Sequence, residues 1–391
     1  MNEMQDFVGI GRQHLQDESY GVAAFFLQQA VQENPLDGQA WNGFLLALSL
    51  MRREEDTRTA LARYGMQQGL TFDREILLFA LMHWRNNPLA LGEWVRAILR
   101  MKGIDTQVKT AISGMAEDLE RSYGDLLKTH GAEMLRSEGM INLEETAFRQ
   151  LHLERMMSIP LDTTYELIKS WLEDEEMILD GIRLLSMLPD PRSEKLLRRI
   201  CRNEEIDAKA RTHAMLALRW LGVRGRVRLE KFGESFIIDL DHPDPELTIS
   251  VPEIFKPALD RMKLWFAKEK GLISKDEYEQ YAATDDMDLP ETMNVKLEEA
   301  QVPPILQEVI HAVIRAAYDE YYPLVPIPTG MRQWSGAFVS LMKSYAMSKG
   351  MDWPYGDSEQ DEISTQHKNW LLSGTPNFYE SIKDKRLAPS F

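Results

Sequence analysis

The stretch FVGIGRQHLQDESYGVAAFFLQQAVQENP, residues 7–35, decides the fold that this sequence predicts. Its large, small and helix-breaking residues follow one another at spacings of 3, 1, 3, 9, 4, 3 and 5: Phe7, Ile10, Gly11, His14, Ala23, Leu27, Ala30 and Pro35. Antiparallel helices approach closely where side chains are small, so we expect Ala23 and Ala30 in the second helix to contact Gly11 in the first. Pro35 has no amide proton and ends the second helix. The stretch therefore predicts a helical hairpin.

This string, over residues 4–36, resembles one tetratricopeptide (TPR) repeat in its large and apolar start, its two small alanines and its closing proline. Residues 37–70 resemble a second, degenerate unit, in which Trp41 takes the first large position while Thr57 and Tyr64 replace the small residues. Such units stack on their neighbours, so the resemblance implies an α-solenoid that holds another protein. A helical hairpin of a different all-α fold is the alternative.

The resemblance also implies a binding surface. The first helix of each TPR unit faces the groove, which makes Arg12, Gln39 and Asn42 candidate partner-binding residues. TPR domains that grip a partner's C-terminal carboxylate carry Lys and Asn at the fifth and ninth positions of the first repeat, where this chain has Val8 and Arg12. A receptor for chaperone tails is therefore disfavoured.

A second region with a repeat spans residues 144–222. Four residues recur about 33 positions later in the same order: Gly181, Ile182, Leu185 and Leu188, then Ala214, Met215, Leu218 and Leu221. Asp190-Pro191 lies where a turn between helices is needed, since this pair breaks one helix and caps the next. The pattern resembles a pair of HEAT-like units. An ordinary helical bundle is the alternative.

Basic residues crowd the end of this region. The twelve are Arg192, Lys195, Arg198, Arg199, Arg202, Lys209, Arg211, Arg219, Arg224, Arg226, Arg228 and Lys231. A solvated face that balances the acidic remainder explains them, as does a surface for an acidic peptide, for another face of this protein or for nucleic acid. We select Arg198, Arg202, Arg226 and Arg228 as partner-binding candidates. A net charge of −17 disfavours nucleic acid in general.

Residues 226–240 depart from the helical pattern. Val227, Leu229 and Lys231 alternate with charged residues, and Gly233-Glu234 predicts a β-hairpin with a type II′ turn. The Asp241–Pro245 run continues neither a strand nor a helix. We therefore expect four parts: TPR-like repeats over 1–140, HEAT-like repeats over 141–225, a hairpin and connector over 226–255, and an aromatic-rich helical domain over 256–391.

The last part contains one clear helix, predicted over 305–322, beside which Glu308-x-x-His311 resembles half of a two-metal carboxylate motif. With one such pair only, we expect an exposed ion pair and no metal. The acidic segment 283–304 predicts a mobile loop, and Asp286 and Asp288 lack the glycine and glutamate of an EF-hand. The many aromatic residues after Tyr318 predict a core, with a recognition pocket as the alternative.

Composition sets the remaining limits. The chain has 391 residues, 44% hydrophobic and 27% charged, which is ordinary for a folded protein. The single cysteine, Cys201, excludes an intramolecular disulfide, and no apolar run predicts a signal peptide or membrane span, so the cytoplasm is expected. Thr106 is predicted to cap a helix.

No catalytic or cofactor motif is found. The sequence thus predicts a non-enzymatic intracellular adaptor or scaffold without cofactor, which binds a protein or peptide; a nucleic-acid regulator and an enzyme with an unrecognised site are the alternatives.

Overall fold

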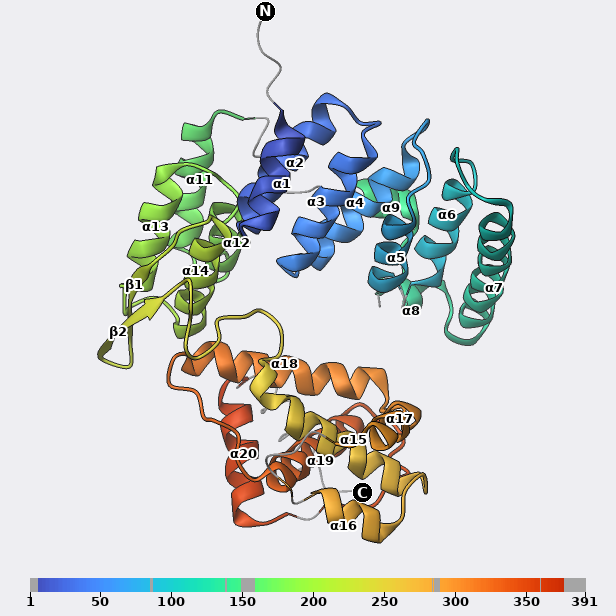
Figure 1. Ribbon diagram of the computed structural model, residues 1–391, viewed down its shortest axis with the longest axis vertical. Coiled ribbons are helices and arrows are strands. Elements are labelled where there is room, and N and C mark those ends of the chain that lie inside the picture. The colour runs from blue at the N-terminus through green and yellow to red at the C-terminus, as the bar shows by residue number, and fades with distance from the viewer. Residues whose placement is uncertain are drawn as a thin grey trace, which may run out of the picture. The chain divides into compact units, whose positions relative to one another are not determined.

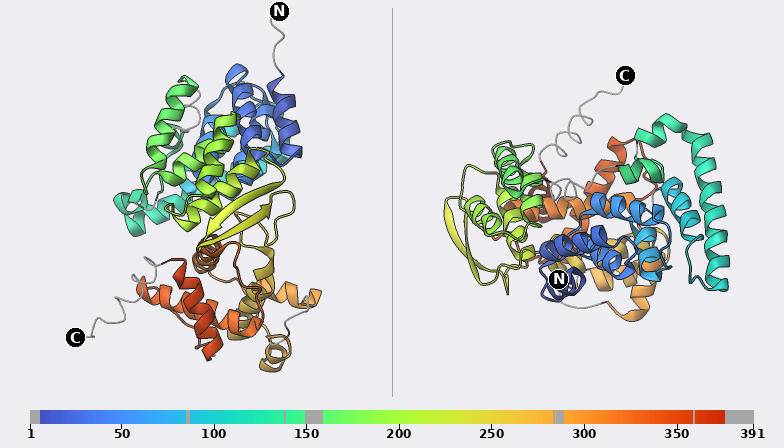
Figure 2. Two further views of the ribbon diagram at one scale, coloured as in Figure 1. Left: turned by 90° about the vertical axis from the view of Figure 1, so that its left-hand side faces the viewer. Right: turned by 90° about the horizontal axis from the view of Figure 1, so that it is seen from above.

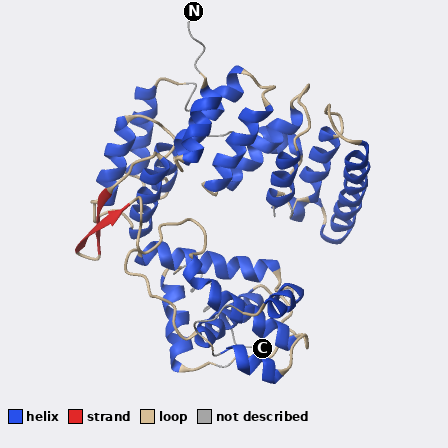
Figure 3. Ribbon diagram, in the orientation of Figure 1, coloured by secondary structure: helices blue, strands red, loops and turns tan. Residues whose placement is uncertain are grey.

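The computed structural model describes residues 6–84, 87–137, 139–148, 159–282, 284, 289–358 and 360–375. Within these ranges the chain forms 19 α-helices and one two-stranded sheet (Figures 1 and 3). The predicted all-α class is confirmed at this level. No helix in the described ranges combines the length and the apolar character needed to cross a membrane. The chain divides into two compact units: unit 1 comprises residues 1–202 and 214–227, and unit 2 comprises residues 203–213 and 228–391.

Unit 1 is mainly helical in its described part. Its helices are α1 (Phe7–Gln16), α2 (Tyr20–Glu33), α3 (Gly38–Leu50), α4 (Glu54–Met66), α5 (Arg74–His83), α6 (Pro88–Ile98), α7 (Thr106–His130), α8 (Ala132–Ser137), α9 (Leu143–Phe148), α11 (Leu161–Leu172), α12 (Ile178–Leu185), α13 (Pro191–Cys201) and the second half of α14 (Ala208–Trp220). Helix α1 packs against α2 and α3, α3 against α4 and α5, and α4 against α6. The long α7 packs against α6 (Figures 1 and 2).

The first three helices meet at one side chain. Leu27 of α2 is fully buried, and a Cβ added at Gly11 of α1 would lie 2.5 Å from its Cγ. A Cβ at Gly43 of α3 would lie 3.1 Å from the Leu27 methyl groups. Ala23 and Ala30 are buried as expected. The side chain nearest to the space that Gly11 leaves is Leu27, and the expected contact of Gly11 with the alanines stays a prediction.

A different side chain joins the next helices. Trp94 of α6 is buried against Gly65 of α4, where an added Cβ would lie 2.5 Å from the indole Cδ1. Its Nε1 donates a hydrogen bond of 2.8 Å to the carbonyl of Leu61. Tyr64 lies between Trp41 and Trp94, with ring centroids 5.7 Å and 6.4 Å away. Aromatic side chains therefore fill the contacts among α3, α4 and α6.

Helices far apart in the sequence also pack together in unit 1. A Cβ added at Gly21 of α2 would overlap the carbonyl oxygen of Ser186, which follows α12, and would approach that of Trp220 at the end of α14. Arg219 pairs with Glu18 at 2.7 Å. The end of α12 and the end of α14 thus contact the first helical hairpin.

Several helices start at a residue whose side chain caps them. Asn87 caps α6 and Asp190 caps α13, each followed by a proline at the first helical position; the Asp190-Pro191 start was predicted. The predicted cap of α7 at Thr106 was wrong by one residue: the Asp105 carboxylate accepts the Gln107 amide, and Thr106 is already helical. An aspartate satisfies the free amides at least as well as a threonine.

Unit 2 contains the sheet and the C-terminal helices. Its elements are β1 (Arg226–Lys231, of which the last four residues belong to this unit), β2 (Glu234–Asp239), the 3₁₀-helix η1 (Glu253–Phe255), α15 (Lys256–Glu269), α16 (Lys275–Ala282), α17 (Glu291–Glu299), α18 (Pro304–Tyr321), α19 (Met331–Ser348), α20 (Glu362–Ser373) and the start of α14. Helix α15 packs against α16, α17 and α19, while α18 and α19 pack against α20.

Two local predictions in unit 2 need correction. The hairpin exists, but its loop is Phe232-Gly233, with φ of 58° and 74°, which is the type I′ pattern and not the predicted Gly233-Glu234 turn. The predicted mobile loop over 283–304 contains α17, because Met293 and Leu297 bury one face of a helix. Asp286 and Asp288 lie outside the described residues.

Aromatic side chains fill the interior of unit 2. Trp334 and Phe338 of α19 are buried, and Trp334 contacts Phe255 and Trp370 at centroid distances of 5.3 Å and 5.8 Å. The core interpretation is confirmed for these residues. Phe378 lies outside the described ranges.

A buried lysine lies where β1 contacts α18. Lys231 has no exposed surface, and its Nζ donates to Thr212 Oγ1 at 2.9 Å and to the carbonyls of Asp319 and Glu320 at 2.9 Å and 2.7 Å. All three ammonium protons therefore have acceptors. Burial lowers the pKa of Lys231 to about 7, against a smaller opposing effect of Glu320.

Candidate functional site

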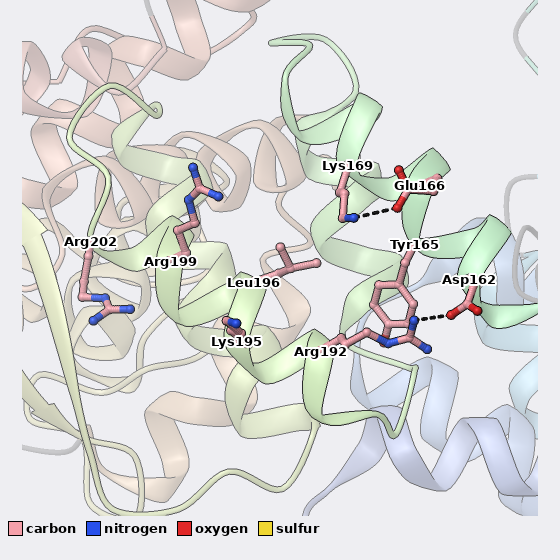
Figure 4. A pocket seen from close by; sticks show the side chains of 9 residues that line it. All are labelled: Asp162, Tyr165, Glu166, Lys169, Arg192, Lys195, Leu196, Arg199 and Arg202. Atoms are coloured by element: carbon pink, nitrogen blue, oxygen red, sulfur yellow. Dashed lines mark hydrogen bonds and ion pairs between the residues drawn. The ribbon is translucent and has the colours of Figure 1, made fainter.

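A groove lies between α11 and α13 in unit 1 (Figure 4). Its cavity has a volume of about 500 Å³. The lining residues are Asp162, Tyr165, Glu166, Lys169, Arg192, Lys195, Leu196, Arg199 and Arg202. Five of these nine side chains are cationic, which makes the groove a candidate site for an anionic ligand.

The amphipathic pattern of α13 positions the cations. Leu197, Ile200 and Cys201 are buried on one side of the helix. Lys195, Arg199 and Arg202, spaced four and three residues apart, therefore share the opposite face and are exposed. Figure 4 shows these three side chains projecting from α13 around Leu196, while Lys169 and Asp162 come from α11.

These three cations are not neutralised within the described part of the chain. No acidic group of the described residues lies within ion-pair distance of Lys195, Arg199 or Arg202. Arg202 Nε donates to the Arg198 carbonyl at 2.9 Å, which leaves its charge uncompensated. An anion in the groove would thus meet positive charge without first displacing a carboxylate.

The other two cations are engaged at one side of the groove. Arg192 pairs with Asp162 at 2.5 Å and with Asp190 at 3.0 Å, and hydrogen bonds to these carboxylates raise its pKa further above the usual range. Lys169 pairs with Glu166 at 2.6 Å. Of these ion pairs, Arg192–Asp162 links α13 to α11 at this edge of the site.

The base of the groove is partly apolar. Tyr165 is buried, its hydroxyl forms a 2.6 Å hydrogen bond with Ser193, and the Arg192 guanidinium lies 4.1 Å from its ring centroid. Burial raises the pKa of Tyr165, so the hydroxyl stays neutral. Leu196 is half-buried. An occupant can therefore contact an apolar surface as well as the cations.

The predicted partner-binding residues have different surroundings. Arg202 lines the groove, whereas Arg198 pairs with Glu194 at 2.7 Å and does not line it. Arg226 and Arg228 are exposed on β1, where Arg228 contacts Glu230. Of the twelve basic residues of the predicted patch, only Arg192, Lys195, Arg199 and Arg202 line the groove. Lys231 is buried instead, so the patch is not one continuous solvated face.

The N-terminal candidates are only partly available. Arg12 and Gln39 are exposed, as the TPR resemblance implies. Asn42 is half-buried, and its Nδ2 donates to Glu75 at 2.8 Å and to Asp73 at 3.3 Å. Its amide joins α3 to the start of α5, and the binding role of Asn42 stays a prediction.

Sequence reasoning did not find the α11 side of the groove. The residues on this side follow a helical spacing that is typical of any exposed helix face: Asp162, Tyr165, Glu166 and Lys169. They line a groove only because α11 lies near α13 in the folded chain.

No metal site emerges from the described residues, which hold no group of three or more His, Cys, Asp or Glu side chains arranged around a common point. Glu308 is exposed and His311 is half-buried on α18.

Comparison with known proteins gave no match: no protein-family model, curated protein or solved structure resembles this chain detectably.

Proposed function

We propose that this chain is a non-enzymatic adaptor or scaffold whose helical surface holds an acidic segment of a partner protein in the groove between α11 and α13. The observation that carries the proposal is the row of three cations, Lys195, Arg199 and Arg202, which form no ion pair with any described residue and lie beside the apolar surface of Tyr165 and Leu196. Complementary charge steers a partner into such a groove, and apolar contact retains it.

The helical architecture supports this role. Within α1–α5, each helix packs against the next one along the chain, which is compatible with the TPR-like repeats that the sequence resembles. Helices α11, α12 and α13 also pack in succession, which is compatible with the HEAT-like resemblance, and the groove lies between α11 and α13. Stacked helices of this kind commonly present rigid surfaces to peptides without chemistry of their own.

A peptide fits the groove better than nucleic acid does. Asp162 and Glu166 line the same cavity, and carboxylates repel the phosphates of a continuous backbone. A peptide can place its carboxylates beside α13 and an apolar side chain on Leu196. The net charge of −17 further disfavours a polyanion that extends beyond the groove.

The test uses a fluorescent synthetic peptide, Asp-Glu-Asp-Leu-Asp-Glu-Asp, and fluorescence anisotropy with the full chain. A triple change of Lys195, Arg199 and Arg202 to Gln should weaken binding about tenfold or more, because exposed ion pairs contribute up to about 1 kcal/mol each. Arg198→Gln and Arg199→Gln form a matched pair on one helix, and only Arg199→Gln should weaken binding.

Two further probes complete the test. The same peptide with Asn and Gln in place of its acids should not bind, because its charge is gone. A single-stranded oligothymidylate should bind more weakly than the acidic peptide. Equal effects of Arg198→Gln and Arg199→Gln would remove the groove as the site, and tighter binding of the oligonucleotide would favour a nucleic-acid regulator instead.

A further inference from the structure

The two-stranded sheet of unit 2 has one edge in use and one edge open. The two-residue loop Phe232-Gly233 makes residues 231 and 234 the first hydrogen-bonded pair of the hairpin. On each strand, the backbone N–H and C=O groups of every second residue therefore point outward, away from the other strand. On β1 these include Glu230, whose carbonyl accepts a 2.5 Å hydrogen bond from Arg211. The side chain of Arg211 therefore covers the β1 edge at this point.

Within the described residues, the β2 edge has no such cover. By the same alternation, Ser235, Ile237 and Asp239 direct their backbone N–H and C=O groups outward. No backbone atom of these three residues forms a hydrogen bond with another described element. Natural proteins usually protect an edge strand with a lysine, a proline, a bulge or a covering segment. The centre of β2, Ser-Phe-Ile-Ile, contains no protecting residue.

Exposed apolar surface accompanies the open edge. Ile237 is 60% exposed and Phe232 in the adjoining turn is 46% exposed. Carboxylates mark both ends of the strand, Glu234 and Asp239, and neither has an ion-pair partner among the described residues. The edge thus offers backbone hydrogen bonds, an apolar centre and two negative ends.

We propose that the open edge of β2 accepts an extended segment of a partner protein as a third strand, and that this segment has an apolar centre with a basic residue at each end. The backbone of the segment satisfies the outward groups of Ser235, Ile237 and Asp239, as in other cases of strand addition. Its apolar side chains cover Ile237, and its basic ends face Glu234 and Asp239. A second copy of β2 fits poorly, because its own acidic ends would meet these carboxylates.

The probe is a synthetic peptide, Lys-Thr-Ile-Val-Ile-Thr-Lys, with binding to the full chain measured by fluorescence anisotropy. Amides of an added strand alternate between facing β2 and facing solvent. Two versions of the peptide, one N-methylated at odd positions and one at even positions, should therefore differ in affinity: one binds normally and the other binds at least tenfold more weakly. An equal loss of affinity in both versions, or no loss in either, would overturn strand addition.

Variants of the protein give a second readout. Ser235→Pro removes one outward amide without touching the hydrogen bonds to β1, because proline is tolerated at such edge positions. Ser235→Pro should weaken peptide binding at least tenfold. Ile237→Lys should also weaken binding, because it removes apolar contact and its charge repels the basic peptide. Ile327→Ser is the control, since Ile327 is 81% exposed elsewhere in unit 2.

The variants also separate the competing explanations. Weaker binding by Ile327→Ser to the same extent as by Ile237→Lys would identify non-specific apolar adhesion and overturn the proposal. Self-association in sedimentation experiments that Ser235→Pro abolishes would assign the edge to a second copy, and would also overturn it. If Ser235→Pro has an altered circular dichroism spectrum, its folding is disturbed. The binding of the two N-methylated peptides to the unchanged protein then tests the proposal without this variant.

Discussion

The junction of α1, α2 and α3 and the junction of α4 and α6 solve one packing problem with different chemistry. In the first, Leu27 fills the space left by two glycines, Gly11 and Gly43. In the second, Trp94 fills the space at Gly65 and adds a hydrogen bond to a backbone carbonyl. Close helix packing therefore requires a small residue opposite a large one, and the identity of the large one is free.

Trp94→Ala should give the largest effect at the aromatic junction. The substitution leaves a cavity at Gly65 and removes the donor to the Leu61 carbonyl, so we expect a loss of about 3–5 kcal/mol in unfolding free energy. Chemical denaturation monitored by circular dichroism measures it. A loss below 1 kcal/mol would show that α6 does not depend on this contact.

Gly11→Ala should have a smaller effect at the aliphatic junction. The new methyl group would overlap Leu27 and lower the unfolding free energy by about 1–3 kcal/mol. The higher helix propensity of alanine offsets up to about 1 kcal/mol of this loss. Leu27→Ala in the same chain should remove the overlap, which a double-mutant cycle detects as coupling. Gly114→Ala is the control: nothing lies within 4 Å of an added Cβ there, so it should be neutral or stabilising.

Alkaline pH should reduce the stability of the aromatic junction, which contains Tyr64, more than that of the aliphatic junction. Burial, with a smaller effect of Asp73, raises the pKa of Tyr64 well above its usual value of 10. The unfolded chain therefore releases this proton above pH 10 while the folded chain retains it, and stability falls as the pH rises. We expect Tyr64→Phe to reduce that loss by up to about 1.4 kcal/mol per pH unit above 10. Melting temperatures at pH 9 and 11 measure it, and identical losses in both proteins would contradict the assignment.

Arg12→Glu should have the smallest effect on folding. Arg12 is exposed on α1, so the change in unfolding free energy should stay within about 0.5 kcal/mol. If the faces of α1 and α3 bind a partner, as the TPR resemblance implies, the variant should recover less of that partner in affinity capture. Unchanged recovery of every captured protein would leave the α11–α13 groove and the β2 edge as the remaining surfaces.

Local sequence signals predicted much of the fold. Asp190-Pro191 fixed the start of α13, and strict alternation placed Lys231 on the same face as Val227 and Leu229, where it is buried. The turn was misplaced because Phe232 adopts a positive φ, which the sequence rule reserves for glycine. The acidic composition around α17 hid the four-residue spacing of Met293 and Leu297, although that signal was present.

The groove was predictable only in part. The helical spacing of Lys195, Arg199 and Arg202 is visible in the sequence, and so is the large number of basic residues. Which of those residues are neutralised is decided by tertiary contacts such as Arg192 with Asp162, thirty positions apart. The same holds for Asn42, which α5 engages through Asp73 and Glu75. Local periodicity contains no information on such pairs.

The Leu27 contact has a consequence for how unit 1 opens. Because one side chain occupies the space at both Gly11 and Gly43, α2 cannot separate from either neighbour without exposing the leucine and emptying both sites. Amide protons in α1, α2 and α3 should therefore exchange with solvent through a shared opening event, as a single cooperative element. The N-terminal helices thus constitute one thermodynamic unit of three helices, although the sequence pattern that identified them describes only two.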